Sequence, residues 1–149
     1  MKHDEYELQK QISKYLELTY PDVLFVSDTV ASLQMTRGQA GRNKAIQKRG
    51  FSTPDLAIYE PKNGFCGLFL ELKTETPYKK NGELKAQKVI EYKTIKGGRF
   101  PVGEYDHLQQ QNKALETLKE KGYYACFSWG FDMTKEIIDN YLMGAYVRE

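Results

Sequence analysis

The sequence has few cysteines and no long apolar run, and both absences exclude classes of protein. Its two cysteines, Cys66 and Cys126, each stand inside an apolar run and not in a paired ligand motif. We therefore expect buried thiols, and neither a disulfide framework nor a zinc site. No stretch approaches a membrane span, and the residues after Met1 lack the apolar core of a signal peptide. The sequence thus predicts a cytoplasmic protein with no membrane partner.

What is present fits one folded domain. A chain of 149 residues can bury a core without disulfides or a structural metal. Hydrophobic residues make up 40% of it and charged residues 28%, which is ordinary for a globular protein. We expect a single domain over residues 1–149, with a Lys-rich insertion at about 77–105.

Basic residues are concentrated in two patches, although the net charge is only +2. Between Thr29 and Pro54 the sequence has basic residues and no acid. From Lys79 to Arg99, seven basic residues stand with two acids, Glu83 and Glu91. Charge runs of this kind are usually solvated faces, and contact with nucleic acid is the alternative that neither patch decides alone.

The order of predicted elements indicates an α/β fold with a mixed central sheet flanked by helices. Apolar spacing and turn residues predict a helix over 4–19, a strand over 23–27 and a region over 34–50 with a short helix. A hairpin of strands 55–59 and 66–73 follows, and then a long loop or extra hairpin over 77–105. The last predicted elements are a helix from Leu108 that stops at Gly122, a strand over 123–129, and a helix that is capped by Asp132 and runs through Tyr141. The strand after Gly122 is expected to join the sheet parallel to a hairpin strand through a right-handed crossover.

The second hairpin strand carries charge where an apolar run ends. Because side chains alternate along a strand, Phe69, Glu71 and Lys73 share one face while the leucines between them share the other. Burying a carboxylate and an ammonium at that position costs desolvation free energy, which a purely structural role would not repay. We therefore expect a polar ligand to meet them.

The first hairpin strand opens with Pro54 and Asp55, which can lie beside Glu71. Two carboxylates held close together repel one another unless a cation lies between them. A hard divalent ion such as Mg²⁺ prefers oxygen ligands of this kind. The same ion could bind a scissile phosphate and activate a water, with Lys73 positioning that water or offsetting negative charge.

These residues resemble the signature of the PD-(D/E)xK nuclease superfamily, in which Pro-Asp is followed by Glu-x-Lys. More narrowly, residues 50–56, then Glu71 to Lys73, then Gln111 at its spacing to Leu118 and Gly122, resemble the VRR-NUC group of virus-type replication and repair nucleases. The small size is similar to that of stand-alone phage members. The resemblance implies a restriction-endonuclease-like core in the order αβββαβ.

The resemblance also implies roles for individual residues. Asp55, Glu71 and the backbone carbonyl of Leu72 would hold Mg²⁺ or Mn²⁺, with Lys73 as catalytic base or water-orienting cation and Gln111 completing the site. The family places a glutamate on the first helix, where Glu5, Glu7 and Glu17 compete. We choose Glu5, because a helical period puts it on the face of Leu8 and Ile12, with Gln9 as a neighbour one turn later. His107 is expected to be exposed and not a metal ligand.

The implied activity is hydrolysis of DNA by a metal-dependent endonuclease that prefers branched or flapped molecules in phage replication, repair or recombination. Its partner is DNA, and cutting two strands symmetrically would favour a homodimer. The expected nucleic-acid contacts are Arg42, Lys44, Lys48, Arg49, Lys79 and Lys80. Two alternatives stay open, a catalytically inactive nucleic-acid-binding module of the same fold and a restriction-type enzyme that reads a short sequence.

Overall fold

The computed structural model describes residues 2–28 and 35–149. Along the chain it contains α1 (Lys2–Thr19), β1 (Phe25–Ser27), α2 (Arg37–Ile46), β2 (Leu56–Ile58), β3 (Leu68–Lys73), β4 (Lys88–Ile95), β5 (Gly98–Asp106), α3 (His107–Glu120), β6 (Tyr124–Trp129) and α4 (Phe131–Leu142). Gln34, where the predicted basic region begins, lies outside the described residues. Within the described part, no helix is both long enough and apolar enough to cross a membrane.

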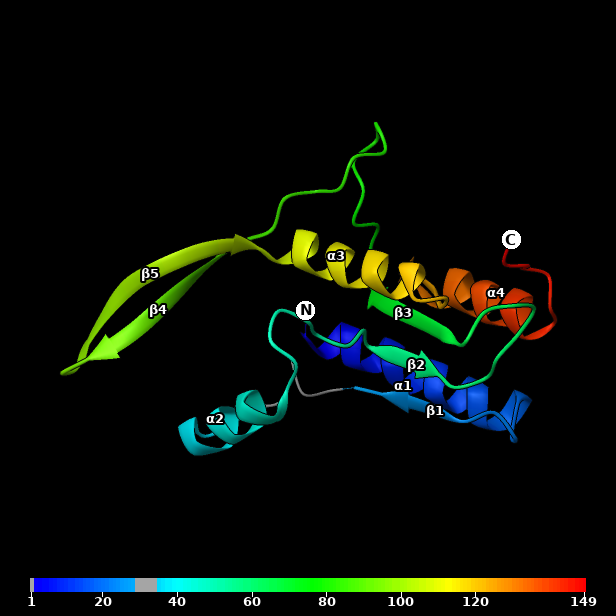
Figure 1. The fold of residues 1–149 in the computed structure, drawn as a ribbon, viewed down its shortest axis with the longest axis horizontal. Coiled ribbons are helices and arrows are strands. Elements are labelled where there is room, and N and C mark those ends of the chain that lie inside the picture. The colour runs from blue at the N-terminus through cyan, green and yellow to red at the C-terminus, as the bar shows by residue number, and fades with distance from the viewer. Residues whose placement is uncertain (1, 29–34) are drawn as a thin grey trace.

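The main sheet has the strand order β1-β2-β3-β6. β2 pairs antiparallel with β1 and with β3, whereas β6 lies parallel to β3. The connection between β3 and β6 contains β4, β5 and α3, so the predicted parallel pairing of the last strand with a hairpin strand is confirmed (Figure 1). The predicted mixed sheet flanked by helices is confirmed as well.

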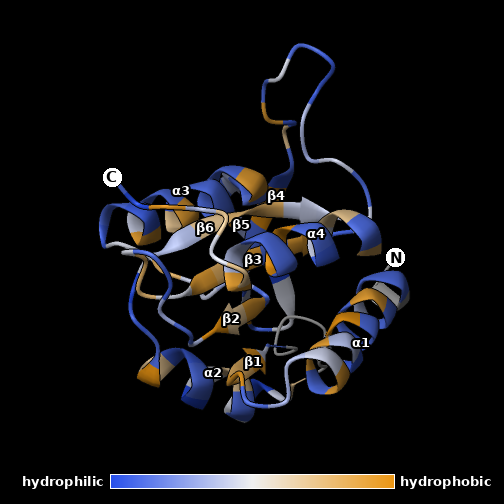
Figure 2. Ribbon diagram, turned by 90° about the vertical axis from the view of Figure 1, so that its right-hand side faces the viewer, coloured by the Kyte–Doolittle hydropathy of each residue, from blue (hydrophilic) through white to orange (hydrophobic). Residues whose placement is uncertain are grey.

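Each face of the sheet packs against helices. Leu68, Leu70 and Leu72 of β3 join a buried cluster with apolar side chains of α1 and α4. On the opposite face, Phe69 packs with a second cluster that contains Leu115 of α3 and Phe127 of β6. Figure 2 shows hydrophobic colour on the strands of the sheet, which lie between the helices. The sheet is therefore the middle layer, with α3 on one side and α1 and α4 on the other.

Two elements extend from this layered body and bury nothing of their own. α2 begins with a capping box in which Thr36 and Gln39 exchange hydrogen bonds, and none of its described side chains is buried. β4 and β5 form a separate two-stranded antiparallel sheet. Figure 1 shows both elements projecting from the same end of the molecule. The excursion predicted at 77–105 is thus a loop followed by an extra hairpin.

Two local predictions were wrong. Asp132 does not cap α4, because the helix begins directly after Gly130, which has φ 75° and occupies the N-cap position. Asp132 instead lies in the first turn, where a negative charge still favours the helix. Cys66 is exposed, because it precedes β3 and belongs to the hairpin connection. Cys126 fits the expectation better, since burial raises the pKa of its thiol to about 11.

Other local signals hold. The helix predicted from Leu108 corresponds to α3, which starts one residue earlier and is capped by Asp106 through a hydrogen bond from the Gln109 backbone. Gly122, just beyond its end, has φ 101°, a conformation that residues with a side chain rarely adopt. The chain can therefore turn sharply into β6.

Candidate functional site

The hairpin of β2 and β3 places Asp55 beside Glu71. Leu56 pairs with Leu70, and one further step of this antiparallel register sets Asp55 opposite Glu71. Residues directly opposite on antiparallel strands point to the same face. The two carboxylates therefore share the face that also carries Lys73, as the alternation of side chains predicts.

Burial makes this pair energetically unusual. Glu71 is only 5% exposed, and its pKa is raised well above its usual range, first by desolvation and then by the negative charge of Asp55. The pKa of Asp55 is raised as well, mainly by burial, although its hydrogen bonds oppose this. The two acids consequently compete for ionisation, and a bound cation would relieve their repulsion.

The backbone of Leu72 completes the arrangement. Its N–H donates to Oδ2 of Asp55 at 2.8 Å. Since the carbonyl of Lys73 accepts from the N–H of Gly130 on the β6 side, the carbonyl of Leu72 points the other way, toward β2. The register places Pro54 across from it, and a proline has no N–H to donate. The Pro-Asp pair thus supplies a carboxylate and leaves a carbonyl without a ladder donor.

Gln111 reaches the pair from α3. Its Nε2 donates to Oε1 of Glu71 at 2.8 Å. Its own Oε1 is buried and has no hydrogen-bond partner in the structure. A buried unpaired acceptor costs free energy unless water or an ion satisfies it. Gln111 therefore both holds Glu71 and presents a further oxygen.

Lys73 and Glu5 lie at the same end of β3. Lys73 is half-buried, and its positive charge lowers the pKa of both Asp55 and Glu71. Glu5 is on the first turn of α1, and its pKa is raised by desolvation and by Asp55 while Lys73 opposes the shift. Glu5 also raises the pKa of Glu71. Glu5 therefore lies close enough to Asp55 and Glu71 for their charges to interact.

Two neighbours of the pair, Asp28 and His107, were not expected from the sequence. Asp28 follows β1, and its backbone N–H donates to the carbonyl of Asp55 at 2.8 Å. Buried Gln9, expected beside Glu5, donates instead to the carbonyl of Asp28. His107 is not exposed as expected but half-buried, and its pKa is lowered by burial and by the charge of Lys73. Its spacing of four residues from Gln111, one helical turn, was the available signal.

A hollow adjoins this cluster. It has a volume of about 250 Å³ and is lined by residues of β1 and β2 together with Asp28, Thr53 and Pro54. Tyr59, which is 54% exposed, forms part of its wall. Pro54 precedes Asp55 in the sequence and Asp28 donates a backbone hydrogen bond to it, whereas neither Asp55 nor Glu71 lines the hollow.

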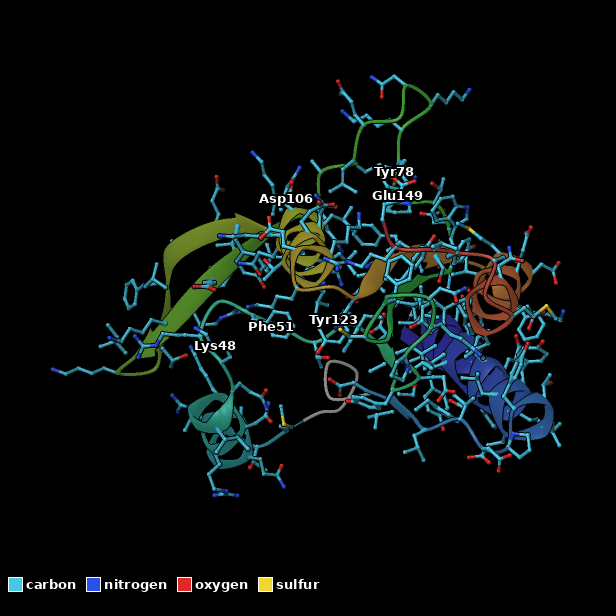
Figure 3. The ribbon with its side chains drawn as sticks, turned by 45° about the vertical axis from the view of Figure 1, so that its right-hand side comes forward. Lys48, Phe51, Tyr78, Asp106, Tyr123 and Glu149 are labelled. Carbon is cyan, nitrogen blue, oxygen red and sulfur yellow. The ribbon has the colours of Figure 1, made fainter. Side chains whose placement is uncertain are left out.

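The expected nucleic-acid contacts fall into two separate groups. Arg42 and Lys44 lie on α2, and Lys48 and Arg49 follow it on the segment that leads to β2; all four are exposed. Figure 3 shows Lys48 and Phe51 on that segment. Lys79 and Lys80 are also exposed, but Figure 1 shows their loop on the far side of the body from α2. The structure therefore does not join the two groups into one surface.

The described residues contain no group of three or more His, Cys, Asp and Glu side chains arranged to hold a metal ion. The candidate ligands are instead two carboxylates, Asp55 and Glu71, a backbone carbonyl and an amide oxygen. Mg²⁺ commonly binds through one or two carboxylates and keeps several waters. The donor set fits such an ion and does not fit a zinc site.

Comparisons with known proteins bear on the fold. No protein-family model matches the chain, and no curated protein matches its sequence. A solved structure named VRR_NUC domain protein is similar with a TM-score of 0.54 and 17% sequence identity. The match covers 94% of this chain and 88% of that one. At this low identity, the structural similarity shows a shared fold alone. The predicted restriction-endonuclease-like α/β fold is confirmed.

Proposed function

We propose that this protein is a metal-dependent endonuclease that hydrolyses phosphodiester bonds in DNA. The observation that carries the proposal is the buried pair of Asp55 and Glu71 on adjacent strands, with Lys73 on the same face. The fold shared with a VRR_NUC domain protein supports the same reaction class. Branched or flapped DNA, as in phage replication or repair, is the substrate class that we propose.

Asp55, Glu71 and the carbonyl of Leu72 would hold Mg²⁺ or Mn²⁺. The fit rests on the raised pKa of Glu71, the carbonyl that Pro54 leaves without a donor, and the unpartnered Oε1 of Gln111. When bound, such an ion offsets negative charge and lowers the pKa of a water ligand. A third ligand from the backbone explains why no third acid is needed.

The protein's own groups orient the site. The N–H of Leu72 fixes Asp55, and Nε2 of Gln111 fixes Glu71, so neither carboxylate is free to rotate away. The ammonium of Lys73 lies at the end of the strand, where it can orient a water for attack and stabilise developing negative charge. Glu5, from α1, adds a carboxylate that can hold the same water or its proton.

Arg42, Lys44, Lys48 and Arg49 would contact phosphates on one side of the site. Such contacts supply affinity through counterion release and set the register of a duplex without reading its bases. Lys79 and Lys80 face a different direction, so they would meet a second arm of a branched molecule. This division of the basic residues favours a structured substrate over a simple linear duplex.

The direct test is cleavage of linear, flapped and four-way branched DNA with Mg²⁺, with Mn²⁺ and with EDTA. We expect metal-dependent cleavage that is strongest on branched substrates and is lost in Asp55→Ala. If no substrate is cut by the folded protein in either metal, the proposal is wrong. Binding that persists in EDTA without any cleavage would identify an inactive binding module.

A further inference from the structure

The hairpin of β4 and β5 has no partner in the structure. None of its described side chains is buried. Five of its large apolar residues are each at least 47% exposed, namely Ile90, Tyr92, Ile95, Phe100 and Val102, whereas Val89 and Tyr105 near its base are half-buried. An isolated two-stranded ribbon is only marginally stable in water, and exposed apolar side chains grouped together mark interaction surfaces. The hairpin is therefore built to contact something outside the chain.

The charge of the hairpin indicates the chemistry of that partner. Its distal half, residues 92–102, contains Lys93, Lys96 and Arg99 and no acid. The acids of the hairpin are confined to its base, at Glu91, Glu104 and Asp106. Arg99 also lies over the ring of Tyr92, at 4.3 Å from its centroid. A cationic tip that carries aromatic and aliphatic side chains complements a polyanion with apolar edges, as a nucleic acid has.

The base of the hairpin is fixed to the candidate site. The carbonyl of Gln87 accepts from the N–H of His107 at 2.7 Å, and Oδ1 of Asp106 accepts from the backbone N–H of Gln87 and of Gln109. These contacts tie the hairpin to the first turn of α3, the helix that carries Gln111 to Glu71. Figure 1 shows the hairpin projecting from the end of the sheet at which β1 and β3 terminate. A polymer bound at the carboxylates would pass alongside it.

We propose that this hairpin is an arm that lies in the major groove of the DNA duplex next to the phosphodiester that is cut. This inference rests on the proposed function and adds the mode of substrate binding. The major groove of B-form DNA, about 12 Å wide, admits a two-stranded ribbon, whereas the minor groove, about 6 Å wide, admits strands only where the duplex is deformed. The deep, narrow major groove of A-form RNA does not admit one either.

The shape of the hairpin suits this placement. β4 has eight residues, so at about 3.3 Å per residue the arm is about 26 Å long, most of one turn of a duplex. The register shifts between Glu91 and Tyr92, and such bulges bend a ribbon and increase its twist. Tyr92 pairs with Pro101 and Lys93 pairs with Phe100, so Tyr92 and Arg99 lie on one face of the ribbon and Lys93 and Phe100 on the other. Whichever face is turned to the base edges therefore presents one aromatic ring to them, while the long side chains of Lys93, Lys96 and Arg99 would reach phosphates along the groove.

The first test measures how duplex binding depends on salt. A variant with Lys93→Gln, Lys96→Gln and Arg99→Gln is compared with a control that carries Lys10→Gln, Lys14→Gln and Lys121→Gln, all exposed and outside the hairpin. Binding to a 30-base-pair duplex is followed by fluorescence anisotropy in EDTA, so that cleavage does not interfere. The slope of log K against log salt should become less steep by about three in the hairpin variant only, with at least about tenfold weaker binding near 0.1 M salt.

The second test asks which groove is occupied. Methyl green, which binds the major groove, should displace the wild-type protein from the duplex, and distamycin, which binds the minor groove, should not. An RNA duplex of the same sequence should bind at least about tenfold more weakly than the DNA duplex. Displacement by distamycin alone would overturn the major-groove placement.

The outcomes separate this inference from the proposed function. Unchanged salt slopes in the hairpin variant, with metal-dependent cleavage intact, would overturn the arm and leave the nuclease standing. Loss of cleavage in Asp55→Ala would support the nuclease, and a less steep salt slope in the hairpin variant alone would support the arm. If sedimentation shows a wild-type dimer that the hairpin variant converts to a monomer, the exposed face belongs to a second copy of the chain and the groove assignment fails.

Discussion

Two of the carboxylate clusters that the structure describes, one around Asp139 and the other around Asp55 and Glu71, are satisfied in opposite ways. Between α1 and α4, Oδ1 of Asp139 accepts hydrogen bonds from the hydroxyls of Tyr15 and Tyr20, and Oδ2 accepts from the ammonium of Lys135. Burial alone would raise the pKa of Asp139, but these donors hold it below its usual range. The protein itself thus stabilises the charged form.

At the end of β2 and β3, the protein leaves the charged form unsatisfied. Asp55 receives one backbone N–H and Glu71 one amide N–H. Burial raises the pKa of both acids, and the negative charge of Asp55 raises the pKa of Glu71 further. A carboxylate that only joins two helices is best paired completely, as Asp139 is. A pair kept close in spite of its repulsion is ready for a cation from outside. The contrast is between a carboxylate paired within the protein and the pair that we propose as a cation site.

The largest expected effect is that of Glu71→Gln. This variant removes the charge but keeps the shape, so cleavage of branched DNA in Mg²⁺ should fall at least about a thousandfold, equivalent to about 4 kcal/mol. Without metal, its free energy of unfolding should rise, because the buried repulsion with Asp55 is gone. Cleavage rates and melting temperatures in EDTA measure the two effects. Activity within tenfold of wild type would show that Glu71 is not a site residue.

The site could be predicted from the sequence wherever its geometry is local. The two strands follow one another in the sequence, so antiparallel pairing and the alternation of side chains were enough to place Asp55, Glu71 and Lys73 on one face. The spacing of Gln111 to the end of its helix was equally informative. The tests above bear on the roles of these residues, while their proximity follows directly from the fold.

What the sequence did not reveal depends on contacts between distant segments. Asp28 was missed because β1 is only three residues long, and no local signal sets its register with β2. Tyr15 and Asp139 are 124 residues apart, so nothing in either segment indicates the other. His107 was expected to be exposed because the sequence did not define the two strands of the hairpin that leads into α3. Tertiary packing decided each of these cases.

A smaller effect is expected from Gln111→Ala. This change leaves both carboxylates in place and removes the amide that orients Glu71, so metal affinity or activity should fall about ten- to a hundredfold. Gln110→Ala, one residue away and exposed, is the matched control and should cleave as wild type. Metal titrations followed by cleavage rate distinguish the variants. Equal behaviour of the two would leave Gln111 with no part in the site.

Asp139→Asn should affect stability without affecting the reaction. Loss of the paired charge should lower the free energy of unfolding by about 1 to 2 kcal/mol near pH 7, since part of the contact is open to solvent. The folded-state pKa of Asp139 is depressed, so its contribution is present above the usual carboxyl range and is lost as pH falls through that lower pKa. The difference in melting temperature from wild type should therefore shrink at acidic pH. Glu136→Gln, on the same helix and exposed, should show no such difference.

The smallest expected effect is stabilisation of the folded protein by Mg²⁺, and it distinguishes the Asp55 and Glu71 pair directly from Asp139. Mg²⁺ at about five times its Kd should stabilise the folded protein by about 1 kcal/mol, or roughly 3 °C in melting temperature. The shift should disappear in Glu71→Gln, which has lost the ligand, and persist in Asp139→Asn, whose carboxylate never needed a cation. Thermal melts of all three proteins with and without Mg²⁺ measure it. A shift that survives in Glu71→Gln would place the ion elsewhere, because the repulsion that makes this pair a binding site would no longer exist.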